Sequence, residues 1–481
     1  MNTGAPWPSV DDAERRVLAM QTKLHQWAVS DPDRRFDDVG NLVYDPAFLV
    51  VAWSRVRVNK GARTAGVDGI VPAKVADPAG WLDQIREGLK SRRFSPDRVR
   101  EVMIPKRNGK LRRLGIPTAQ DRVVQASLKL VMEPIFEADF KPCSYGFRPK
   151  RRAQDAIAEI HYLGSPSRNY EWVFEADITA CFDEINHRAL MERVAARVSD
   201  KRVLALVRVF LASGILSESG ISRATFTGTP QGGILSPLLA KIALSVLDEH
   251  FTRKWEALGP EWTRAKLIRQ GVPAMKLVRY ADDFVVMVRG TKADVEKLWK
   301  ELPDVLAPIG LRLSAEKSGT CHIDEGFDFL GFRIKRRSWK GRPGKKAVYT
   351  YPSKRSLNAI IDKVRTLTRR ARHRTLADLL AAVNPVLRGW SSYFRHGVSK
   401  RTFNYLDHYT WWRIVGWLRK RHVGLNWQTI HRRFLPGWVI RDGRYELHRA
   451  AAETVSRYRY RGAQIPTPWQ ATAHPTESRM R

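Results

Sequence analysis

The sequence contains few cysteines and no long apolar run, and each absence excludes a class of protein. Its three cysteines (Cys143, Cys181 and Cys321) are far apart and form no Cys-x-x-Cys pair. A zinc site or a disulfide framework is therefore not expected, and a reducing cytosol is the simplest compartment. No stretch approaches 18 uncharged apolar residues, so no membrane span is expected. The N-terminus also lacks the basic-then-apolar pattern of a signal peptide.

Acidic residues are also scarce relative to basic ones. The 481 residues include 84 Lys and Arg but only 49 Asp and Glu, which gives a formal net charge of +35. Such an excess indicates a polyanionic partner, and RNA or DNA is the commonest one. The alternative is a basic surface that is merely well solvated.

The positive charge is concentrated in the last third of the chain. Residues 331–481 carry 34 basic and 7 acidic residues, and they also hold 8 of the 16 Trp and 8 of the 13 Tyr. Cations neutralise phosphates, and aromatic rings stack on unpaired bases. This region therefore favours a nucleic-acid-binding surface, although a helical domain with a Trp-rich core would have a similar composition.

Hydrophobic periodicity predicts an α+β architecture followed by an all-α one. We expect a buried strand at 172–178 and basic linker residues at 336–346, and a frayed tail after about 464. Helices are expected at 1–60, 119–138, 292–308 and 353–435, and strand pairs at 98–117, 276–288 and 327–334.

Paired carboxylates stand at the bend of one predicted hairpin. Apolar strands flank Tyr280-Ala281-Asp282-Asp283 on both sides, and Asp177 ends another apolar strand. An Asp-rich turn is the ordinary reading of such a pair. Two buried strands that present Asp177, Asp282 and Asp283 side by side could instead hold two Mg²⁺ ions for phosphoryl transfer. Glu175 should share a strand face with Asp177, and we interpret it as structural.

These residues belong to a series of motifs that resembles the reverse transcriptases encoded by group II introns. The resemblance runs from about 45 to 470, and its motifs follow the order of the family. They are GVDGI (66–70), IPKRNGKLRRLGIPT (104–118), DRVVQASLKLVMEPIFE (121–137), SYGFRPKRRAQDAI (144–157), ADITACFDEI (176–185), GTPQGGILSPLLAKI (228–242), RYADDFVV (279–286), GLRLSAEKS (310–318) and FDFLGFRI (327–334).

The resemblance implies a role for each candidate site residue. Asp177, Asp282 and Asp283, with the Ile178 carbonyl, correspond to the ligands of two Mg²⁺ ions, and Lys317 to the acid that protonates the pyrophosphate leaving group. A surface lysine is the alternative for Lys317.

The other implied roles concern the incoming dNTP. Lys106 and Arg112 (or Arg113) resemble the cations that grip its triphosphate, although an exposed basic turn has the same composition. Phe182 resembles the steric gate against a 2′-OH, unless it is a core aromatic. Gln231 resembles a nucleotide contact, and Gly232 allows the backbone to approach closely.

The resemblance also implies a right-hand polymerase with a maturase region. NPVLRGWSSYFRHG (384–397) and YLDHYTWWRIVGWLRKRH (405–422) resemble the thumb and maturase part of the family, in which Arg388, Arg395 and Arg413 would contact RNA. The expected division is an N-terminal helical extension (1–60), fingers (61–165), palm (166–335), thumb and maturase domain (336–404) and a basic RNA- and DNA-binding region (405–481).

The implied function is RNA-directed DNA synthesis on intron RNA together with assistance in splicing and retrohoming. The expected partners are group II intron RNA and DNA target, primer and template, with no membrane and no obligate protein partner. Bacterial cytosol and nucleoid are the expected location. Paired cysteines are missing after Cys321, so no endonuclease of the kind common in this family is expected. Two alternatives remain: a polymerase co-opted for host defence or DNA repair, and a splicing factor that only binds RNA.

Overall fold

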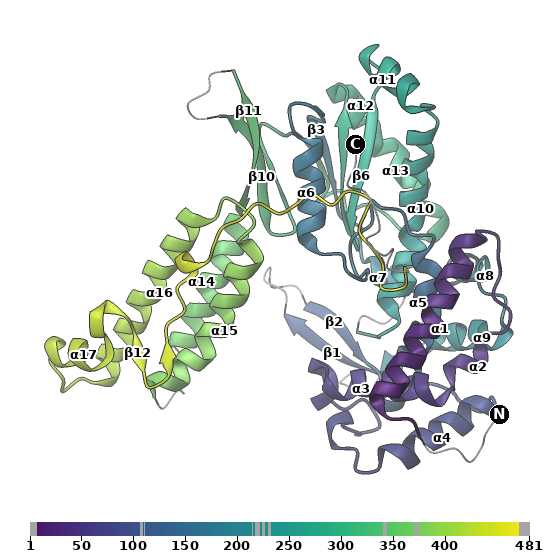
Figure 1. Ribbon diagram of the computed structural model, residues 1–481, viewed down its shortest axis with the longest axis horizontal. Coiled ribbons are helices and arrows are strands. Elements are labelled where there is room, and N and C mark those ends of the chain that lie inside the picture. The colour runs from purple at the N-terminus through teal and green to yellow at the C-terminus, as the bar shows by residue number, and fades with distance from the viewer. Residues whose placement is uncertain are drawn as a thin grey trace, which may run out of the picture.

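The computed structural model describes residues 7–105, 109, 111–213, 215–216, 222–223, 227–228, 232–339, 344–369 and 375–470. Within these ranges, mixed helices and mostly antiparallel strands give way to a helical C-terminal part (Figure 1). This order agrees with the predicted change from α+β to largely helical architecture.

The N-terminal segment is helical, as predicted. Ser9 caps the first helix by accepting from the Asp12 amide, and Asp45 caps the third by accepting from the Ala47 amide. The third helix is buried over most of its length and packs against the first helix and α5 (Ala119–Glu137). The helices are α1 (Val10–Ser30), α2 (Gly40–Val43), α3 (Pro46–Val58) and α4 (Pro78–Lys90), with short 3₁₀ turns at Lys60–Arg63 and Pro72–Lys74.

The predicted basic hairpin is confirmed. Strand β1 (Val99–Pro105) runs antiparallel to β2 (Leu111–Ile116), with Ile104 opposite Arg112. The small sheet continues through β4 (Ile215–Leu216), which lies parallel to β1, to β5 (Ser222–Arg223).

A four-stranded antiparallel sheet, here called the central sheet, has the order β6-β7-β3-β8. Its side chains alternate between two cores: Phe174 and Val286 belong to one, Val173 and Val285 to the other. The strands are β3 (Trp172–Ala176), β6 (Ala274–Tyr280), β7 (Asp283–Arg289) and β8 (Gly319–His322).

Helices cover both faces of this sheet. On the Phe174 side lie α10 (Ser236–Glu256) and α13 (Leu298–Leu306), and on the Val173 side lies α6 (Ala153–Leu163). Figure 1 shows its strands β3 and β6 between helix α6 and helices α10 and α13. The remaining helices of this part are α7 (Cys181–Glu184), α8 (His187–Ala195), α9 (Lys201–Ala212), α11 (Glu261–Arg269) and α12 (Lys292–Glu296), with a 3₁₀ turn at Ala307–Ile309.

A second antiparallel sheet, ordered β11-β10-β9, corrects the predicted linker. The strands are β9 (Phe327–Phe329), β10 (Phe332–Ser338) and β11 (Lys346–Pro352). Residues 336–338 and 346, expected in a linker, therefore belong to hairpin strands. The reason is that Arg336 points inward, with only 3% of its surface exposed, and pairs with Glu171 and Asp324.

The C-terminal part is helical over the predicted stretch. The helices are α14 (Lys354–Arg369), α15 (Leu376–Phe394), α16 (Lys400–Arg421) and α17 (Trp427–Phe434); short strands β12 (Arg441–Asp442) and β13 (Tyr445–Glu446) and 3₁₀ turns at Pro436–Trp438 and Ala450–Ala452 follow. In the part of the chain that the structure describes, no helix combines the length and the apolar character that crossing a membrane requires.

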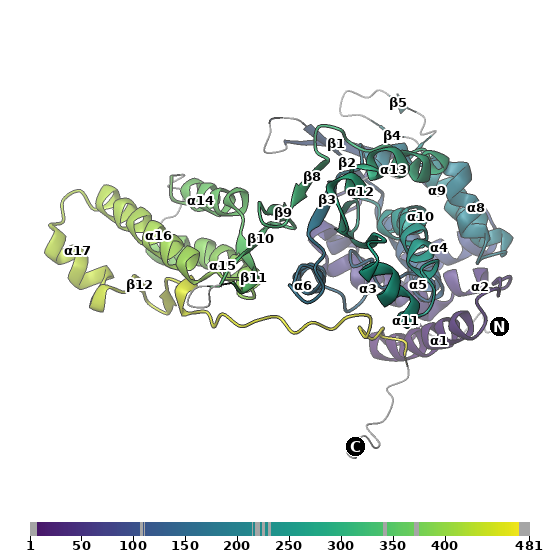
Figure 2. The same cartoon turned by 90° about the horizontal axis from the view of Figure 1, so that it is seen from above.

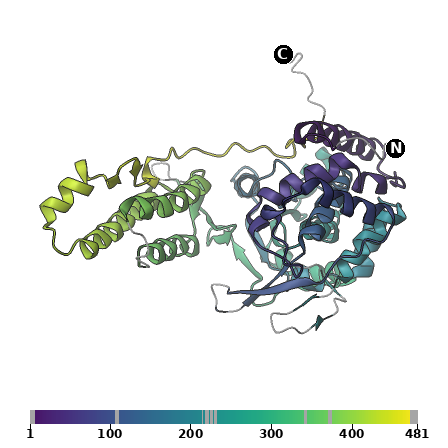
Figure 3. The same cartoon turned by 90° about the horizontal axis from the view of Figure 1, so that it is seen from below.

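The prediction of a frayed tail is wrong for residues 464–470. Residues 456–470, here called the C-terminal strap, run in extended form from the C-terminal helices back to α1 (Figures 2 and 3). Arg461 forms a two-pronged ion pair with Asp155 of α6, at 2.8 and 2.6 Å. Trp469 is buried and donates to the Gln21 side chain of α1 at 3.2 Å.

Candidate polymerase active site

The register of the central sheet brings the three predicted carboxylates together. Ala176, the last residue of β3, is opposite Phe284 of β7, so the next residue, Asp177, comes level with Asp283. Asp282 occupies the turn between β6 and β7, since Tyr280 pairs with Asp283. Three carboxylates from two segments more than 100 residues apart therefore meet at one edge of the sheet.

The turn between β6 and β7 has an unusual backbone. Ala281 adopts φ 59°, a left-handed conformation that is costly for a residue with a Cβ. Gly146 packs directly on the turn, and a Cβ in its place would overlap the Ala281 amide nitrogen. Its loop is held to β6 because the Tyr145 amide donates to the Arg279 carbonyl at 2.8 Å.

Removal from water and, after it, repulsion between neighbouring carboxylates raise the pKa values of the carboxyls in this turn. Loss of water, together with the charge of Asp177, raises the pKa of Asp282. The same loss of water, with the negative charges of Asp282 and Asp177, raises the pKa of Asp283 to about 6. Lys317 and Arg112 act against the shift at Asp282, so both cations lie within electrostatic reach of the turn.

Lys317 lies against Asp177, and its predicted role stays a prediction. Its Nζ is 2.5 Å from Asp177 Oδ2, while the side chain remains 60% exposed. The segment before it is joined to the end of β3 by a bridge between Ile178 and Leu313. Across this bridge the Ser314 amide donates to the Asp177 carbonyl, and the Thr179 amide donates to the Arg312 carbonyl. Neither of these two bonds uses the Ile178 carbonyl.

Phe182 lies close to the carboxylates along the chain, in the short helix α7. Phe182 is half-buried and packs against the core that contains Phe174, so part of its ring surface is not covered by other residues of the protein. The helix starts immediately after Ala180, which has φ 43°. Gly228 packs on this helix so closely that a Cβ would overlap the Phe182 carbonyl oxygen.

The predicted nucleotide-binding residues are only partly described. Lys106 and Gln231 lie outside the described residues. Arg112 and its alternative Arg113 are exposed on β2. Gly232 has φ 119° and packs against β2, where a Cβ would overlap the Gly115 carbonyl oxygen. The structure thus joins the Gly232 segment to the basic hairpin.

The three arginines expected to contact RNA have different surroundings. Arg388 is exposed on α15. Arg395 is half-buried at the end of the same helix, and its carbonyl accepts from the Ser456 amide. Arg413 is half-buried on α16 and donates to the Thr368 hydroxyl of α14 at 2.9 and 3.2 Å. The structure does not gather them into one exposed cluster.

Glu175 lies on β3, two residues before Asp177. Loss of water raises its pKa to about 7, and Cys321 donates to its carboxylate at 3.6 Å. This contact with β8 fits the structural interpretation.

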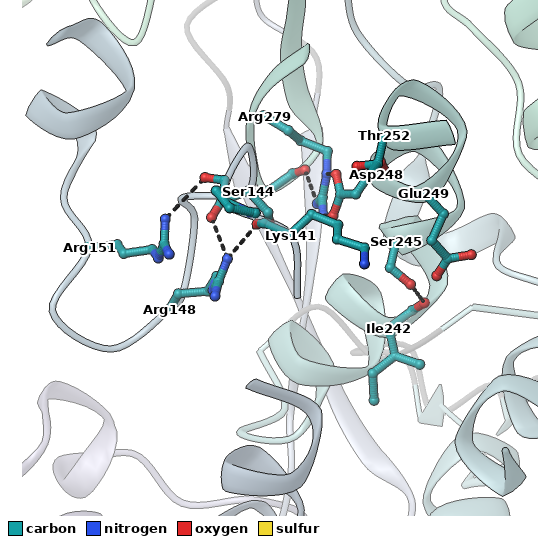
Figure 4. Close-up of polar contacts among 12 residues, drawn as sticks. Lys141, Ser144, Arg148, Arg151, Ile242, Ser245, Asp248, Glu249, Thr252 and Arg279 are labelled. Atoms are coloured by element: carbon teal, nitrogen blue, oxygen red, sulfur yellow. Dashed lines mark hydrogen bonds and ion pairs between the residues drawn. The ribbon is translucent and has the colours of Figure 1, made fainter. Parts of the chain in front are cut away.

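Sequence reasoning missed the residues that support the turn. Arg279 is fully buried between β6 and α10, where it pairs with Asp248 and also donates to the Ala281 carbonyl (Figure 4). Of the two residues in this pair, only Arg279 stands out in the sequence, because an arginine directly before Tyr280 interrupts an apolar strand.

The donor set fits Mg²⁺ ions that share their ligands with a substrate. Within the described ranges, no three carboxylate, imidazole or thiol side chains are arranged to enclose a metal ion by themselves. Mg²⁺ in nucleotide enzymes is usually held by one or two carboxylates plus substrate phosphates, rather than by a cage of protein ligands. Carboxyls that converge at one edge of the sheet suit such a partial site.

Two family models match this chain. Residues 104–334 match the model described as reverse transcriptase (RNA-dependent DNA polymerase), and this range contains all three carboxylates. Residues 357–435 match the model described as group II intron, maturase-specific domain, a range that begins within α14 and extends past the end of α17.

Curated relatives resemble the chain over most of its length. Protein YkfC of Escherichia coli strain K12 is 38% identical over 374 residues, which cover 73% of this chain and 97% of the relative. Group II intron-encoded protein LtrA of Lactococcus lactis subsp. cremoris is 28% identical over 493 residues, covering 86% of this chain and 80% of the relative. The putative COX1/OXI3 intron 2 protein of Saccharomyces cerevisiae is 26% identical and covers 63% of this chain and 39% of the relative.

Proposed function

The chain belongs to the group II intron family of reverse transcriptases and maturases, and we propose that Asp177, Asp282 and Asp283 are the residues that carry its RNA-directed DNA synthesis. The observation that supports this assignment is the sheet register, because it brings Asp177 level with Asp283 beside the turn that contains Asp282.

The three carboxylates, with the Ile178 carbonyl, would hold two Mg²⁺ ions. When bound, such a pair stabilises the negative charge that develops on the attacking and leaving oxygens of an in-line displacement. The protein contributes the position of the ligands: Asp177 comes from β3, and the other two acids from the turn after β6.

The reaction joins a primer to a dNTP. The primer 3′-oxygen loses its proton to water and forms a bond to the α-phosphorus, while the bond from that phosphorus to the pyrophosphate oxygen breaks. Lys317 would leave Asp177 as substrate enters and give a proton to the pyrophosphate. Arg112 would neutralise the triphosphate from β2, together with Lys106, and the hairpin would close over the nucleotide.

Two further residues would select the nucleotide. The half-buried ring of Phe182 is proposed to pack against the sugar and to exclude a 2′-OH. Gln231 is proposed to contact the incoming nucleotide, and Gly232 to let the backbone approach it, since Gly232 adopts φ 119° against β2.

We propose that the domains follow the polymerase plan with the predicted boundaries. Residues 1–60 would be the N-terminal extension, 61–165 the fingers, 166–335 the palm, 336–404 the thumb and maturase domain and 405–481 a basic nucleic-acid-binding region. The hairpin of β10 and β11 spans the boundary at 335/336, so it would connect palm and thumb.

Group II intron RNA is the proposed partner of the C-terminal helices, as the maturase-specific match supports. Exposed aromatics on this part include Trp412, Tyr405 and Trp438, at 55%, 51% and 60% exposure. Three basic residues end α16, so cations and stacking surfaces for unpaired bases lie on one element. Target DNA and the primer–template duplex are the proposed further partners.

Substitution of the carboxylates tests the proposal. Asp282→Ala should lower primer extension on an RNA template by about 10³-fold or more, because one ligand of the metal pair is lost. Binding of intron RNA should be unchanged, since the carboxylates do not attract phosphate. Asp362→Ala is a matched control, since that aspartate is exposed on α14. Near-normal extension by the Asp282 variant would refute the assignment.

A further inference from the structure

The turn between β6 and β7 that contains Asp282, here called the catalytic turn, needs support that its own residues do not supply. Ala281 holds a left-handed backbone directly before Asp282, and a conformation that is costly for alanine persists only where neighbouring groups fix it. On one side Gly146 closes against the turn. The other support comes from a side chain three residues before Asp282.

That side chain is Arg279, and each of its three guanidinium nitrogens donates a hydrogen bond. Its Nε donates to Asp248 Oδ1 at 2.8 Å, and its Nη2 to Asp248 Oδ2 at 2.5 Å. Its Nη1 donates to the Ala281 carbonyl at 3.0 Å. Figure 4 shows Arg279 pointing to Asp248, which projects from helix α10. One guanidinium thus joins the turn to α10.

Stability alone does not explain this pair. Arg279 and Asp248 both have side chains that are fully buried, and removing two charges from water costs about as much as their attraction returns. Replacing a buried ion pair by apolar residues of similar volume is often neutral or stabilising. The planar guanidinium offers instead a fixed geometry, with two donors on a carboxylate and a third directed at one carbonyl oxygen.

The backbone of Arg279 is fixed as well. Its amide donates to the Cys143 carbonyl at 2.9 Å, and its carbonyl accepts from the Tyr145 amide at 2.8 Å. Both the main chain and the side chain of this residue are therefore immobilised, and it can transmit the position of α10 to the Ala281 carbonyl.

We propose that Arg279 and Asp248 form a positioning pair that sets the affinity of the site for its divalent cations, by fixing the Ala281 carbonyl and so the directions of Asp282 and Asp283. Neither residue touches substrate. The inference rests on the proposed function, because it takes Asp282 and Asp283 as metal ligands. Residues outside the ligand set that orient the ligands typically change metal affinity or activity by about 10- to 100-fold when mutated.

Two conservative variants test the pair. Arg279→Lys keeps the positive charge but loses the fork, and Asp248→Asn keeps the shape but weakens the attraction. Mn²⁺ serves as the probe, and its affinity is measured by electron paramagnetic resonance titration of the purified full chain. We expect the Mn²⁺ dissociation constant to rise at least about 10-fold, with a parallel rise in the Mg²⁺ concentration that gives half-maximal primer extension. The affinity for primer–template should not change.

A second buried arginine provides the control. Arg336 is 3% exposed and pairs with two carboxylates, but no contact described for it reaches the catalytic turn. Arg336→Lys should lower the melting temperature without altering Mn²⁺ affinity. If Arg279→Lys behaves in the same way, the positioning role is refuted. If Arg279→Lys does not fold, Asp248→Asn decides, because its side chain has the same size and keeps one oxygen acceptor.

Asp282→Ala separates the two hypotheses. If this variant binds Mn²⁺ as tightly as the unchanged protein, the assignment of the metal ligands is wrong. If it loses Mn²⁺ while Arg279→Lys and Asp248→Asn keep it, the ligands are right and only the positioning pair is refuted.

Discussion

In the first 330 residues, 50 basic residues are accompanied by 42 acidic ones, whereas residues 331–481 carry 34 basic and only 7 acidic residues. The described contacts show what this difference means. Buried cations in the first region, such as Arg148, Arg279 and Lys241, lie beside carboxylates of α5 or α10. In the second region, Arg336 and Arg461 pair with carboxylates of the first region, and the region's own 7 acidic residues are too few to pair with its other cations. The second region therefore has an excess of cations over carboxylates, and exposed arginines such as Arg388 are available to phosphate.

The largest predicted effect is the loss of stability that follows removal of a buried, paired arginine from the first region. Arg148 pairs with Glu137 at 2.7 Å, with both side chains buried, and donates to the Lys141 and Ser144 carbonyls. Arg148→Ala leaves Glu137 charged and without its cation, so we expect a loss of about 3–5 kcal/mol in the free energy of unfolding. Chemical denaturation measures it.

Arg388→Ala is the matched substitution in the second region. Because Arg388 is exposed on a helix, its removal should change stability by no more than about 0.5 kcal/mol. Similar losses in the two variants would contradict the division of roles.

A second prediction concerns activity without a change of charge. Gly146→Ala introduces a Cβ that overlaps the Ala281 amide and displaces the catalytic turn. A misplacement of about 1 Å can lower a rate by about 100-fold, and we expect a loss of that order in primer extension. Gly389→Ala, on α15, is the control, since no atom would lie within 4 Å of the new Cβ. An active Gly146 variant would show that the turn tolerates movement.

The sequence was sufficient to predict that the carboxylates converge, because they are positioned by local strand patterns. Apolar residues on both sides of Asp282 and before Asp177 predict strands, and strands in one sheet bring their ends together. The supporting pair was not predictable in this way. Asp248 lies in the middle of a helix, where an acidic residue is usually solvated, and its partnership with Arg279 depends on how α10 packs against β6.

The two errors in the fold prediction have the same physical origin. The strand β10 was expected to end at 334, because the basic, glycine-containing run 336–346 was interpreted as a linker, yet Arg336 is buried and pairs with Asp324 and with Glu171, 165 residues away. The tail was expected to fray after 464, but Ile465 and Trp469 are buried, and Trp469 bonds to Gln21, 448 residues away. Local composition contains no information about a partner so distant in the chain.

A third prediction separates an aromatic in the site from one in the core. Phe182→Val should raise incorporation of rNTPs relative to dNTPs by about 10-fold, because the smaller side chain leaves room for a 2′-OH. Competition between the two nucleotides during primer extension measures the ratio. An unchanged ratio, accompanied by lower stability, would show that Phe182 only fills the core.

The smallest predicted effect concerns the salt dependence of RNA binding by the second region. Each phosphate contact made by a cation contributes roughly one unit to the slope of the logarithm of RNA affinity against the logarithm of salt concentration. Arg388→Gln should flatten that slope by about one unit and leave the melting temperature unchanged, since its side chain is exposed. Filter binding of intron RNA at several salt concentrations gives the slope.

Arg413→Gln supplies the opposite case within the same region. Its guanidinium makes two hydrogen bonds to the Thr368 hydroxyl and so joins α16 to α14. We expect this variant to lose about 1.5–3 kcal/mol of stability, as for hydrogen bonds to a charged group, with little change in the salt slope at temperatures where it is folded. If Arg413→Gln flattens the slope as much as Arg388→Gln, the half-buried arginine also contacts phosphate. The charge excess of the C-terminal region would then act through paired and unpaired arginines alike.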